Sequence, residues 1–468
     1  MDEKYTVGEV AKRLKVSKKT ILREIKRKNL QFEKVGRRYL ISENNLSKYL
    51  EKGNEVFELN KLLEIFFKNK YSEMVNLLQK MITMPTISSE LGQEVKLAYF
   101  IKHILDEWGL RSVVYKENEA VAVHASFGYA DKGILLDCPL DTLPAGDLSK
   151  WTYPPFEGVI NKGRMYGRGT ADCKAGIVAM MYTLLFLKLF INEEKIRIEV
   201  VFDGGEQDGT FLGMKQVVGR GLPVSAGIIG YCGDMSDILI GARGYHRFRF
   251  TTHGKAVHTG SRYKPGINAI SKMSKYITEV ERMKLPKSRN SLFSFGPRLT
   301  FSAIEGGRAI NMVPDSCQAK IDIRTIPEIN KKMLDLKLKR IAKSLKTEDM
   351  DFDIDVDYLV GHEAYIVSPK EKIVSDLKDV SEEFLGKSLE LVASGPAHIG
   401  NLLSEFDIPV IVFGPKGENV HSYDEYVEIS SIPLTSQIYI RTVLKYFGIE
   451  NGELEDLGQI KSGWEEWT

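Results

Sequence analysis

The segment Tyr166 to Gly176, Tyr-Gly-Arg-Gly-Thr-Ala-Asp-Cys-Lys-Ala-Gly, constrains the fold of this chain more than any other. Its small residues allow a tight turn, and a long apolar helix is predicted to follow over 177–190. A strand, a tight turn and a helix in this order are typical of α/β folds, in which functional side chains gather at the strand ends. Asp172 stands where the turn meets the helix, so it either binds a ligand there or caps the helix.

Segments with the pattern of strands and segments with the pattern of helices alternate on both sides of this turn. The sequence predicts helices at about 93–108 and 175–191, and strands at 121–125, 134–136, 196–202 and 227–230. This alternation indicates a largely parallel sheet. The last 20 residues, 449–468, are acidic and polar, and we expect a loose tail there.

Positive charge is concentrated near the N-terminus. The first 50 residues contain 14 Lys and Arg against 6 Asp and Glu, although the net charge of the whole chain is only +2. A basic head on a mildly acidic body favours a nucleic-acid-facing module joined to a second unit. Four cysteines in 468 residues exclude a disulfide scaffold. No signal peptide and no apolar run of about 18 residues is evident, so we expect a cytoplasmic protein without a membrane span.

Residues 5–50 have the pattern of a helix-turn-helix unit. Thr6 is expected to cap a helix over 7–14, and Ser17 a second helix over 18–28. The buried side of the second helix is predicted to consist of Ile21, Leu22 and Ile25. A basic hairpin over 33–41 and a short helix from Ser42 to Leu50 follow.

This unit resembles the excisionase-type helix-turn-helix domain, which implies a second helix in the DNA major groove and a hairpin, or wing, on the backbone. Cationic side chains suit phosphate contact, and arginines can reach base edges. The candidate DNA-binding residues are Lys18, Lys19, Thr20, Arg23, Arg27, Arg37 and Arg38. The alternative is a basic protein-binding module. We expect the domain to cover 1–52, with a boundary at Lys52–Asn54 and a helical linker over 53–70.

Three other motifs accompany the Asp172 turn: Leu136-Asp-Cys-Pro-Leu-Asp141, Asp203-Gly-Gly-Glu-Gln-Asp208 and His421-Ser-Tyr-Asp-Glu425. Together they resemble the metallopeptidase family of acetylornithine deacetylase, succinyl-diaminopimelate desuccinylase, aminoacylase and carboxypeptidase G, over about 71–447. The resemblance implies a zinc-peptidase-like, mostly parallel sheet in a body that covers 71–241 and 359–448. It also implies an inserted α+β lid over 242–358 that serves dimerisation.

The resemblance also assigns roles to individual residues. In that family two zinc ions share a bridging aspartate, and a glutamate is the general base that activates metal-bound water. Asp172 matches the bridging aspartate and Glu206 the general base. His421 matches a histidine ligand near the C-terminus. Asp141 matches the aspartate that orients a histidine of the first ion.

Several metal-ligand positions differ from the family. Pro139 stands where the family has the histidine ligand of the first ion, and Gln207 replaces a glutamate ligand. The first ion also has a later acidic ligand in the family, and this position falls at Tyr231 or, with a shift of one residue, at Cys232. Two divalent cations about 3.5–4 Å apart need several carboxylates between them. We therefore expect no two-metal centre, and at most one zinc or other divalent ion at Asp172, Gln207 and His421.

Two alternatives involve other side chains. Cys138, Cys173 and Cys232 each neighbour a ligand position, so a rearranged thiolate site is conceivable. The other interpretation is that small apolar side chains suit tight strand ends and point away from the site. His398 is a further candidate, because the corresponding loop of the family lines the cleft.

The lid keeps its substrate-binding positions. His258 matches a histidine that reaches the reacting carbonyl, in many family members from the partner subunit. Asn311 and Arg324 match lid residues, and a guanidinium fork at Arg324 suits a substrate carboxylate. Alternatively, Arg324 pairs with Asp322 or Asp315.

These features lead to two hypotheses. The first is a homodimeric DNA-binding regulator whose body binds a small carboxylate-bearing metabolite or peptide, with impaired or no catalysis. The second is an active metal-dependent amidohydrolase or peptidase with a reduced or rearranged metal site.

Overall fold

The computed structural model describes residues 4–13, 18, 21, 22, 25, 30–35, 38–88, 92–117, 120–262 and 265–449, without the side chains of residues 38 and 49–58. The chain divides into two compact units. The first consists of Met1–Glu73, Leu189–Asn192 and Leu444–Thr468, and the second of Met74–Lys188 and Glu193–Val443.

The first unit begins with a small antiparallel sheet of order β1-β3-β2, formed by β1 (Lys4–Thr6), β3 (Arg38–Ser42) and β2 (Glu33–Val35). Helix α1 (Val7–Arg13) follows β1. Its first turn is closed by a capping box, in which the Glu9 amide donates to Thr6 Oγ1 at 3.4 Å and the Thr6 amide donates to Glu9 Oε2 at 2.8 Å. The predicted cap at Thr6 is therefore confirmed.

The expected second helix is described only at Lys18, Ile21, Leu22 and Ile25, which are all helical. Ile21 and Ile25 are buried in a core with Val10, as predicted. Leu22 was expected in the same stripe but is 42% exposed. A residue one position after Ile21 is turned about 100° around a helix, so Leu22 falls outside the narrow face that this small core covers. The predicted hairpin is present as β2 and β3.

Helix α3 (Glu43–Ile82) is a single helix of 40 residues. Ser42 caps it, because its Oγ accepts the Asn45 amide at 3.2 Å. The sequence predicted a short helix ending at Leu50 and a boundary at Lys52–Asn54, and both are wrong as element ends, because the helix continues through them. Gly53 costs only about 1 kcal/mol in a helix interior, which the surrounding Leu, Lys and Glu residues offset.

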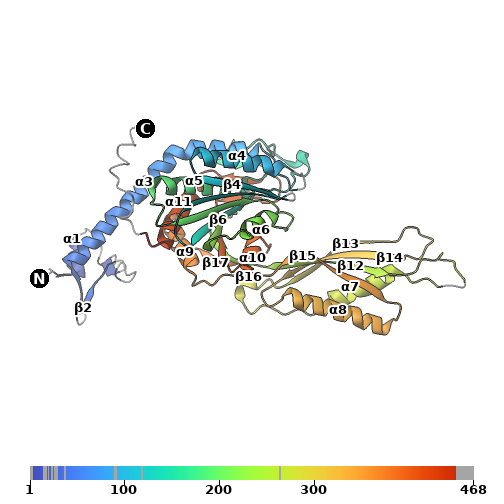
Figure 1. The fold of residues 1–468 in the computed structure, drawn as a ribbon. Coiled ribbons are helices and arrows are strands. Elements are labelled where there is room, and N and C mark those ends of the chain that lie inside the picture. Colours follow the sequence, from blue (N-terminus) through green and yellow to red (C-terminus); the bar gives the residue numbers. More distant parts are fainter. Residues whose placement is uncertain are drawn as a thin grey trace. The chain divides into compact units, whose positions relative to one another are not determined.

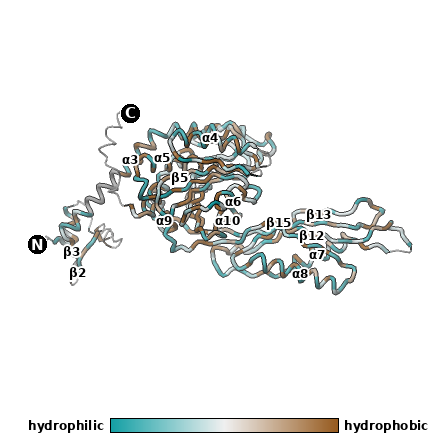
Figure 2. Tube along the Cα trace, viewed as in Figure 1, coloured by the Kyte–Doolittle hydropathy of each residue, from teal (hydrophilic) through white to brown (hydrophobic). Residues whose placement is uncertain are grey.

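The body of the second unit is a mixed nine-stranded sheet of order β16-β11-β18-β10-β6-β9-β5-β4, with β17 paired to β11. Its strands are β4 (Arg111–Glu117), β5 (Ala120–Gly128), β6 (Gly133–Pro139), β9 (Arg197–Asp203), β10 (Val224–Ile229), β11 (Asp237–Ala242), β16 (Tyr365–Ile366), β17 (Glu390–Ser394) and β18 (Val410–Val412). The central neighbours β18, β10, β6 and β9 run parallel. β6 is buried along its whole length, as a central parallel strand should be, and Figure 2 shows the hydrophobic colouring of the strands at this centre.

Helices flank the sheet on both faces (Figure 1). They are α4 (Gln93–Glu107), α5 (Ala175–Phe190), α6 (Leu212–Val218), α9 (Lys372–Leu385), α10 (Ile399–Ser404) and α11 (Ser431–Tyr446). The predicted strands correspond to β5, β6, β9 and β10, and the two predicted helices to α4 and α5. A second sheet of order β19-β20-β8-β7 joins β19 (Gly417–Glu418) and β20 (Tyr426–Glu428) to β8 (Arg164–Tyr166) and β7 (Val159–Asn161).

The inserted segment forms its own α+β layer. Its antiparallel sheet has the order β13-β14-β12-β15, with β13 (Arg298–Gly306), β14 (Ser316–Thr325), β12 (Gly244–His253) and β15 (Asp353–His362). Two helices, α7 (Ala269–Glu281) and α8 (Lys331–Glu348), pack on this sheet over Phe248, Phe250 and Ile321. The predicted sheet with two helices is present, and we refer to residues 244–362 as the lid.

Among the residues that the structure describes, one helical stretch, Thr170–Phe190, is long and apolar enough to cross a bilayer. The expectation that no run reaches such a length is therefore wrong for this segment. However, most of this stretch is buried inside the protein. This burial fits a core helix that covers the sheet.

Gly176, at the start of α5, permits close contact between this helix and the sheet. A Cβ there would lie 2.2 Å from the carbonyl oxygen of Gly230 and 2.8 Å from Sγ of Cys138. We expect Gly176→Ala to lower the free energy of unfolding by about 2–3 kcal/mol, because backbone must move to admit the methyl group. Gly233→Ala is the control, since a Cβ there meets nothing within 4 Å. Equal midpoints for the two variants in urea denaturation would contradict this explanation.

Candidate functional site

Two segments that lie far apart in the sequence meet at the small sheet. β8 leads into the Asp172 turn, and β20 follows the loop that carries His421. The two strands pair antiparallel, with Tyr166 opposite Tyr426. The loop before β20 has positive φ at Asn419, His421 and Asp424, which folds it back toward the turn.

The turn itself is a wide helical loop, η2 (Thr170–Lys174), that follows Gly169 with φ 85°. Asp172 and Cys173 leave the helical region, with φ/ψ of −126°/83° and −142°/25°. Asp172 is buried. Its carboxylate bonds to the side chains of His421, Gln207 and Cys173, and among the described contacts it accepts no backbone amide of α5, so the alternative of a helix cap is not observed.

Asp172, His421 and Gln207 converge. His421 Nε2 lies 2.7 Å from Asp172 Oδ2, and Gln207 Nε2 donates to the same oxygen at 3.0 Å. The Cys173 thiol donates to Oδ1 at 2.6 Å. Burial opposes ionisation of Asp172, but the hydrogen bonds from His421, Cys173 and Gln207 together hold its pKa below the usual range. The same pairing raises the pKa of His421.

Asp141 holds the neighbouring loop in place. Its Oδ1 and Oδ2 accept the backbone amides of Glu206 and Gln207 at 3.2 and 2.9 Å. Pro139 stands where the family has the histidine that such an aspartate orients, and Asp141 bonds backbone amides here instead. Burial raises the pKa of Asp141 to about 7, although these two amides act in the opposite direction.

Glu206 is bound by Tyr231, whose hydroxyl donates to Glu206 Oε1 at 3.0 Å. Burial, with the charges of Asp172 and Asp141, raises the pKa of Glu206 well above its ordinary value. Tyr231 is one of the two positions to which the family's later acid was assigned. It contributes a hydroxyl to this carboxylate instead of an anionic metal ligand.

Of the three cysteines that neighbour ligand positions, Cys173 contacts a site carboxylate, through its hydrogen bond to Asp172 Oδ1. Cys138 Sγ lies 3.2 Å from the Cys173 carbonyl oxygen, and Cys232 is half-buried with a thiol pKa raised by burial. Within the part of the chain that the structure describes, no group of three or more His, Cys, Asp or Glu side chains is arranged to hold a metal ion. His398 caps α10 by accepting the Gly400 amide at 3.2 Å, and burial lowers its pKa to about 3.

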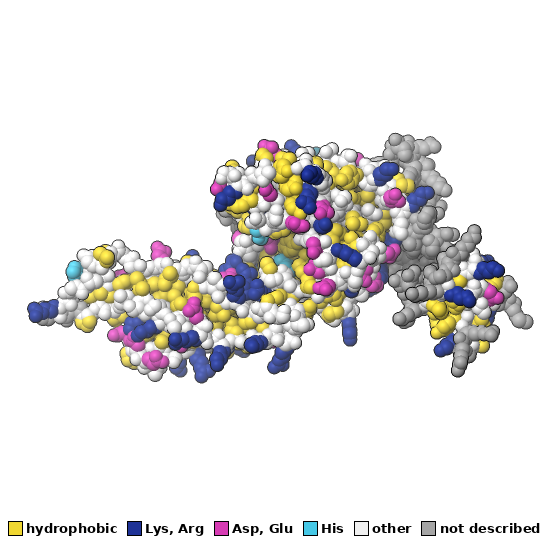
Figure 3. Space-filling view, turned by 180° about the vertical axis from the view of Figure 1, so that it is seen from behind, with side chains coloured by type: hydrophobic (Ala, Val, Ile, Leu, Met, Phe, Trp, Pro, Cys, Tyr) yellow, Lys and Arg dark blue, Asp and Glu magenta, His cyan; other side chains and the backbone are white. Residues whose placement is uncertain are grey.

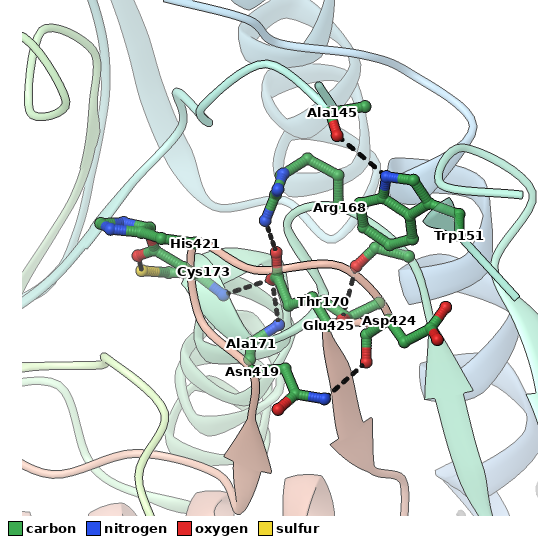
Figure 4. A network of polar contacts seen from close by, with 12 residues as sticks. Ala145, Trp151, Arg168, Thr170, Ala171, Cys173, Asn419, His421, Asp424 and Glu425 are labelled. Carbon is green, nitrogen blue, oxygen red and sulfur yellow. Dashed lines mark hydrogen bonds and ion pairs between the residues drawn. The ribbon is translucent and has the colours of Figure 1, made fainter. Parts of the chain in front are cut away.

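Glu425 organises the turn and was not singled out by the sequence analysis. Its Oε1 accepts the amides of Ala171 and Asp172 at 2.9 and 3.0 Å, and its Oε2 accepts a hydrogen bond from Arg168 Nη1 at 2.6 Å (Figure 4). The Arg168 guanidinium lies 5.2 Å from the centre of the Trp151 ring. The available signal was Glu425 at the end of the His421 motif and Arg168 at the start of the Asp172 motif.

Lys174, two residues after Asp172, is fully buried. Its Nζ donates to the carbonyl oxygens of Met81 and Met84 at 3.1 and 2.8 Å. Burial lowers its pKa to about 7. The turn is thus bonded to Glu425 on one side and to the end of α3 on the other.

The lid candidates lie in two places. His258 and Asn311 are neighbours, because the Thr259 amide donates to the Asn311 carbonyl at 2.9 Å, and both are exposed. Arg324 on β14 donates to Asp322 Oδ1 at 2.7 Å, the pairing that was its alternative explanation. Among the described contacts, none of the three hydrogen bonds with Asp172, His421 or Glu206.

The predicted DNA-binding residues are only partly covered. Lys18 is helical and exposed, and Arg38 belongs to β3, although its side chain is not described. The others lie outside the described residues: Lys19, Thr20, Arg23, Arg27 and Arg37.

The match to a family model decides the family. A model of peptidase family M20/M25/M40 matches residues 135–445, more than half of the chain. The chain belongs to this peptidase family. A helix-turn-helix domain model matches residues 5–54. The protein therefore combines an M20 body with a helix-turn-helix domain.

Relatives and solved structures agree with this assignment. A probable succinyl-diaminopimelate desuccinylase of Staphylococcus aureus is 25% identical over 76% of this chain and 93% of its own length. The aminopeptidase PepT of Bacillus cereus has a TM-score of 0.63 at 20% identity, over 80% of this chain and 98% of its own. A metallo-carboxypeptidase of Sulfolobus solfataricus has a TM-score of 0.65 at 17% identity, over 81% and 100%. At these identities the two solved structures support the fold alone.

Buried acids near the site should make stability depend on pH. Burial, with the charges of Asp141, Asp203 and Asp208, raises the pKa of Glu94 to about 8. The unfolded chain releases this proton near pH 4.5, whereas the folded chain keeps it up to about pH 8, so stability falls as pH rises through this window.

We expect the melting temperature of the chelator-treated protein to fall between pH 5 and pH 8, and Glu94→Gln to reduce that fall. Glu107→Gln, which removes an exposed carboxylate from the same helix α4, is the control. An unchanged pH dependence in Glu94→Gln would show that Glu94 titrates alike in both states.

Proposed function

We propose that the protein is a DNA-binding regulator whose M20 body binds a small carboxylate-bearing metabolite or peptide, with catalysis reduced or absent. DNA binding is assigned to 1–52, joined through 53–70 to a ligand-binding body at 71–241 and 359–448. Dimerisation is assigned to the lid segment, predicted as 242–358, and the tail at 449–468 has no assigned role. The cytoplasm is the expected compartment.

The observation that carries the proposal is the chemistry of the donor set around the Asp172 carboxylate. Its two oxygens are bonded to His421, Gln207 and Cys173, and Pro139 offers no donor atom at the first metal position. A bridging carboxylate between two divalent ions needs further anionic ligands around it. The residues present do not fit a two-metal centre, so we derive no hydrolytic step from one.

The second candidate is an amidohydrolase or peptidase with one metal ion. The convergence of Asp172, His421 and Gln207 favours it, since a carboxylate, an imidazole and an amide oxygen are ligand types for a divalent ion. The ion would displace the His421 hydrogen bond and require the Gln207 amide to turn. Glu206 would then be the general base and Cys232 a further ligand.

A ligand would be held by the lid in either case. Arg324 presents a guanidinium beside Asp322, and His258 and Asn311 are exposed on the same lid. These residues suit the carboxylate and the carbonyl of a small acylated amino acid or short peptide. The proposal therefore assigns them to ligand binding.

The regulator is tested on the full chain with DNA fragments selected for binding from random sequence, by fluorescence anisotropy. We expect binding that weakens steeply with salt, and a lower affinity for Arg37→Ala. Addition of N-acyl amino acids or short peptides is expected to change the DNA affinity. An affinity that no such compound alters would refute the sensor, and absence of DNA binding would refute the regulator.

The enzyme is tested by metal analysis and hydrolysis of the same compounds. The proposal predicts at most one zinc ion per chain and little turnover. Two zinc ions per chain, with hydrolysis abolished by Glu206→Ala, would establish the second candidate instead.

The assembly proposed is a homodimer formed through the lid. β13 is the edge strand of the lid sheet, and an unpaired strand edge offers hydrogen-bonding groups to a second copy. Hydrophobic side chains are exposed at its end and in the loop beyond, with Ile304 58% exposed and Ile310 fully exposed. Figure 3 shows hydrophobic side chains in a band along this part of the molecule.

We expect Ile304→Lys to weaken the dimer about tenfold, because it places a charge in an apolar interface. Sedimentation equilibrium measures the dissociation constant. Leu336→Lys, at an exposed apolar position on α8, controls for the added charge. A monomeric parent protein would remove the proposed dimer.

A further inference from the structure

The end of α3 is bonded to the two loops that build the site. Lys174 belongs to the Asp172 turn and donates to the carbonyl oxygens of Met81 and Met84. The Thr142 amide, next to Asp141, donates to the Thr86 carbonyl oxygen at 2.8 Å, and Thr142 in turn accepts the Ser88 amide at 3.1 Å. Both loops that carry site carboxylates therefore hold the segment in which α3 ends.

Lys174 is well suited to this contact. The last carbonyl groups of a helix lack intrahelical partners, and the helix dipole makes this end negative. The Lys174 amino group donates to carbonyl groups at this end. Because Lys174 is fully buried, loss of the contact would remove the partner of the Met84 carbonyl oxygen, whereas the Met81 carbonyl oxygen would keep the Met84 amide at 3.1 Å.

The other side of the turn is tied to the His421 loop. Glu425 accepts the amides of Ala171 and Asp172, while His421 bonds to the Asp172 carboxylate. A ligand or ion that moves His421 relative to Asp172 must therefore act on the backbone of this turn. The next fixed point along the turn is Lys174, whose own amide donates to the Gly169 carbonyl oxygen at 2.8 Å.

The helix at the far end of this contact is the one that follows the helix-turn-helix segment. α3 begins at Glu43, directly after the hairpin strand β3, and ends at Ile82. We propose that Lys174 couples the Asp172–His421 pair to the C-terminal end of α3, so that a change at the pair alters the helix on which the DNA-binding segment is mounted. This coupling rests on the proposed function as a regulator.

The coupling is measurable without a ligand, by a double-mutant cycle read through amide hydrogen exchange at residues 79–84 of the full chain. His421→Ala removes the imidazole from Asp172, and we expect it to raise exchange at 79–84 about fivefold. Lys174→Met alone should also raise exchange there. With Lys174→Met present, His421→Ala should add less than twofold.

Lys188 provides a matched control. It is a lysine that donates to the carbonyl oxygens of Trp108 and Gly109 at the end of α4, and among the described contacts it makes no hydrogen bond to the Asp172 turn. With Lys188→Met present, His421→Ala should still raise exchange at 79–84 about fivefold. If Lys174→Met does not fold, Lys174→Gln keeps a donor but removes the charge, and the same cycle applies.

Independent, multiplying effects of His421→Ala and Lys174→Met on exchange at 79–84 would overturn the coupling. The coupling would also be overturned if His421→Ala changed the exchange rate at 79–84 by no more than the experimental scatter of the parent protein. A DNA-binding assay on the same four proteins separates the two proposals. If the parent protein does not bind DNA, the proposed regulator is refuted and the exchange result still stands. If the effects of His421→Ala and Lys174→Met on exchange multiply, the coupling is refuted even when DNA and ligand bind.

Discussion

The site depends on the ion pair and the hydrogen bonds that the buried carboxylate of Glu425 makes. An ionised group without water is stable only when charges and hydrogen bonds replace its hydration. Arg168 and the amides of Ala171 and Asp172 do so here. Because those amides belong to the turn, the same bonds that stabilise Glu425 fix the direction of the Asp172 side chain. Loss of Glu425 would leave the Arg168 charge buried and unpaired, and loss of Arg168 would do the same to the Glu425 charge.

A fixed Asp172 has consequences for what this site can bind. Its neighbours are an imidazole, an amide and a thiol, all of which donate to it. Glu206 is bonded to the Tyr231 hydroxyl, and Asp141 accepts the amides of Glu206 and Gln207. The anionic charge that two zinc ions require is therefore scarce. Under the proposed function, a site of this composition recognises a polar molecule through hydrogen bonds and does not activate water.

Sequence motifs predicted the parts of the site that lie within short segments. Asp172, Gln207 and His421 were grouped from spacing and resemblance, and the structure brings them together. Lys174 and Glu425 lie within the quoted motifs but were missed as organising residues, because only the fold brings them to their partners, which are backbone groups of remote segments and the Arg168 side chain. The same limit explains α3, where Gly53 suggested a boundary although the flanking residues favour a helix. Leu22 was misplaced because a helical stripe predicts a face but not the width of the core that covers it.

The regulatory proposal depends on a difference between the Glu425–Arg168 ion pair, which holds the Asp172 turn, and the Asp172–His421 hydrogen bond, at which a ligand would bind. Signal transfer requires an element with two arrangements whose balance a ligand can change. Glu425 and Arg168 are too deeply buried to be that element, since breaking their ion pair costs several kcal/mol. The Asp172–His421 hydrogen bond is a better candidate, because the His421 side chain is 51% exposed and a ligand can compete for it. The rigid pair would then act as the pivot, and Lys174 as the point where a small shift reaches the end of α3.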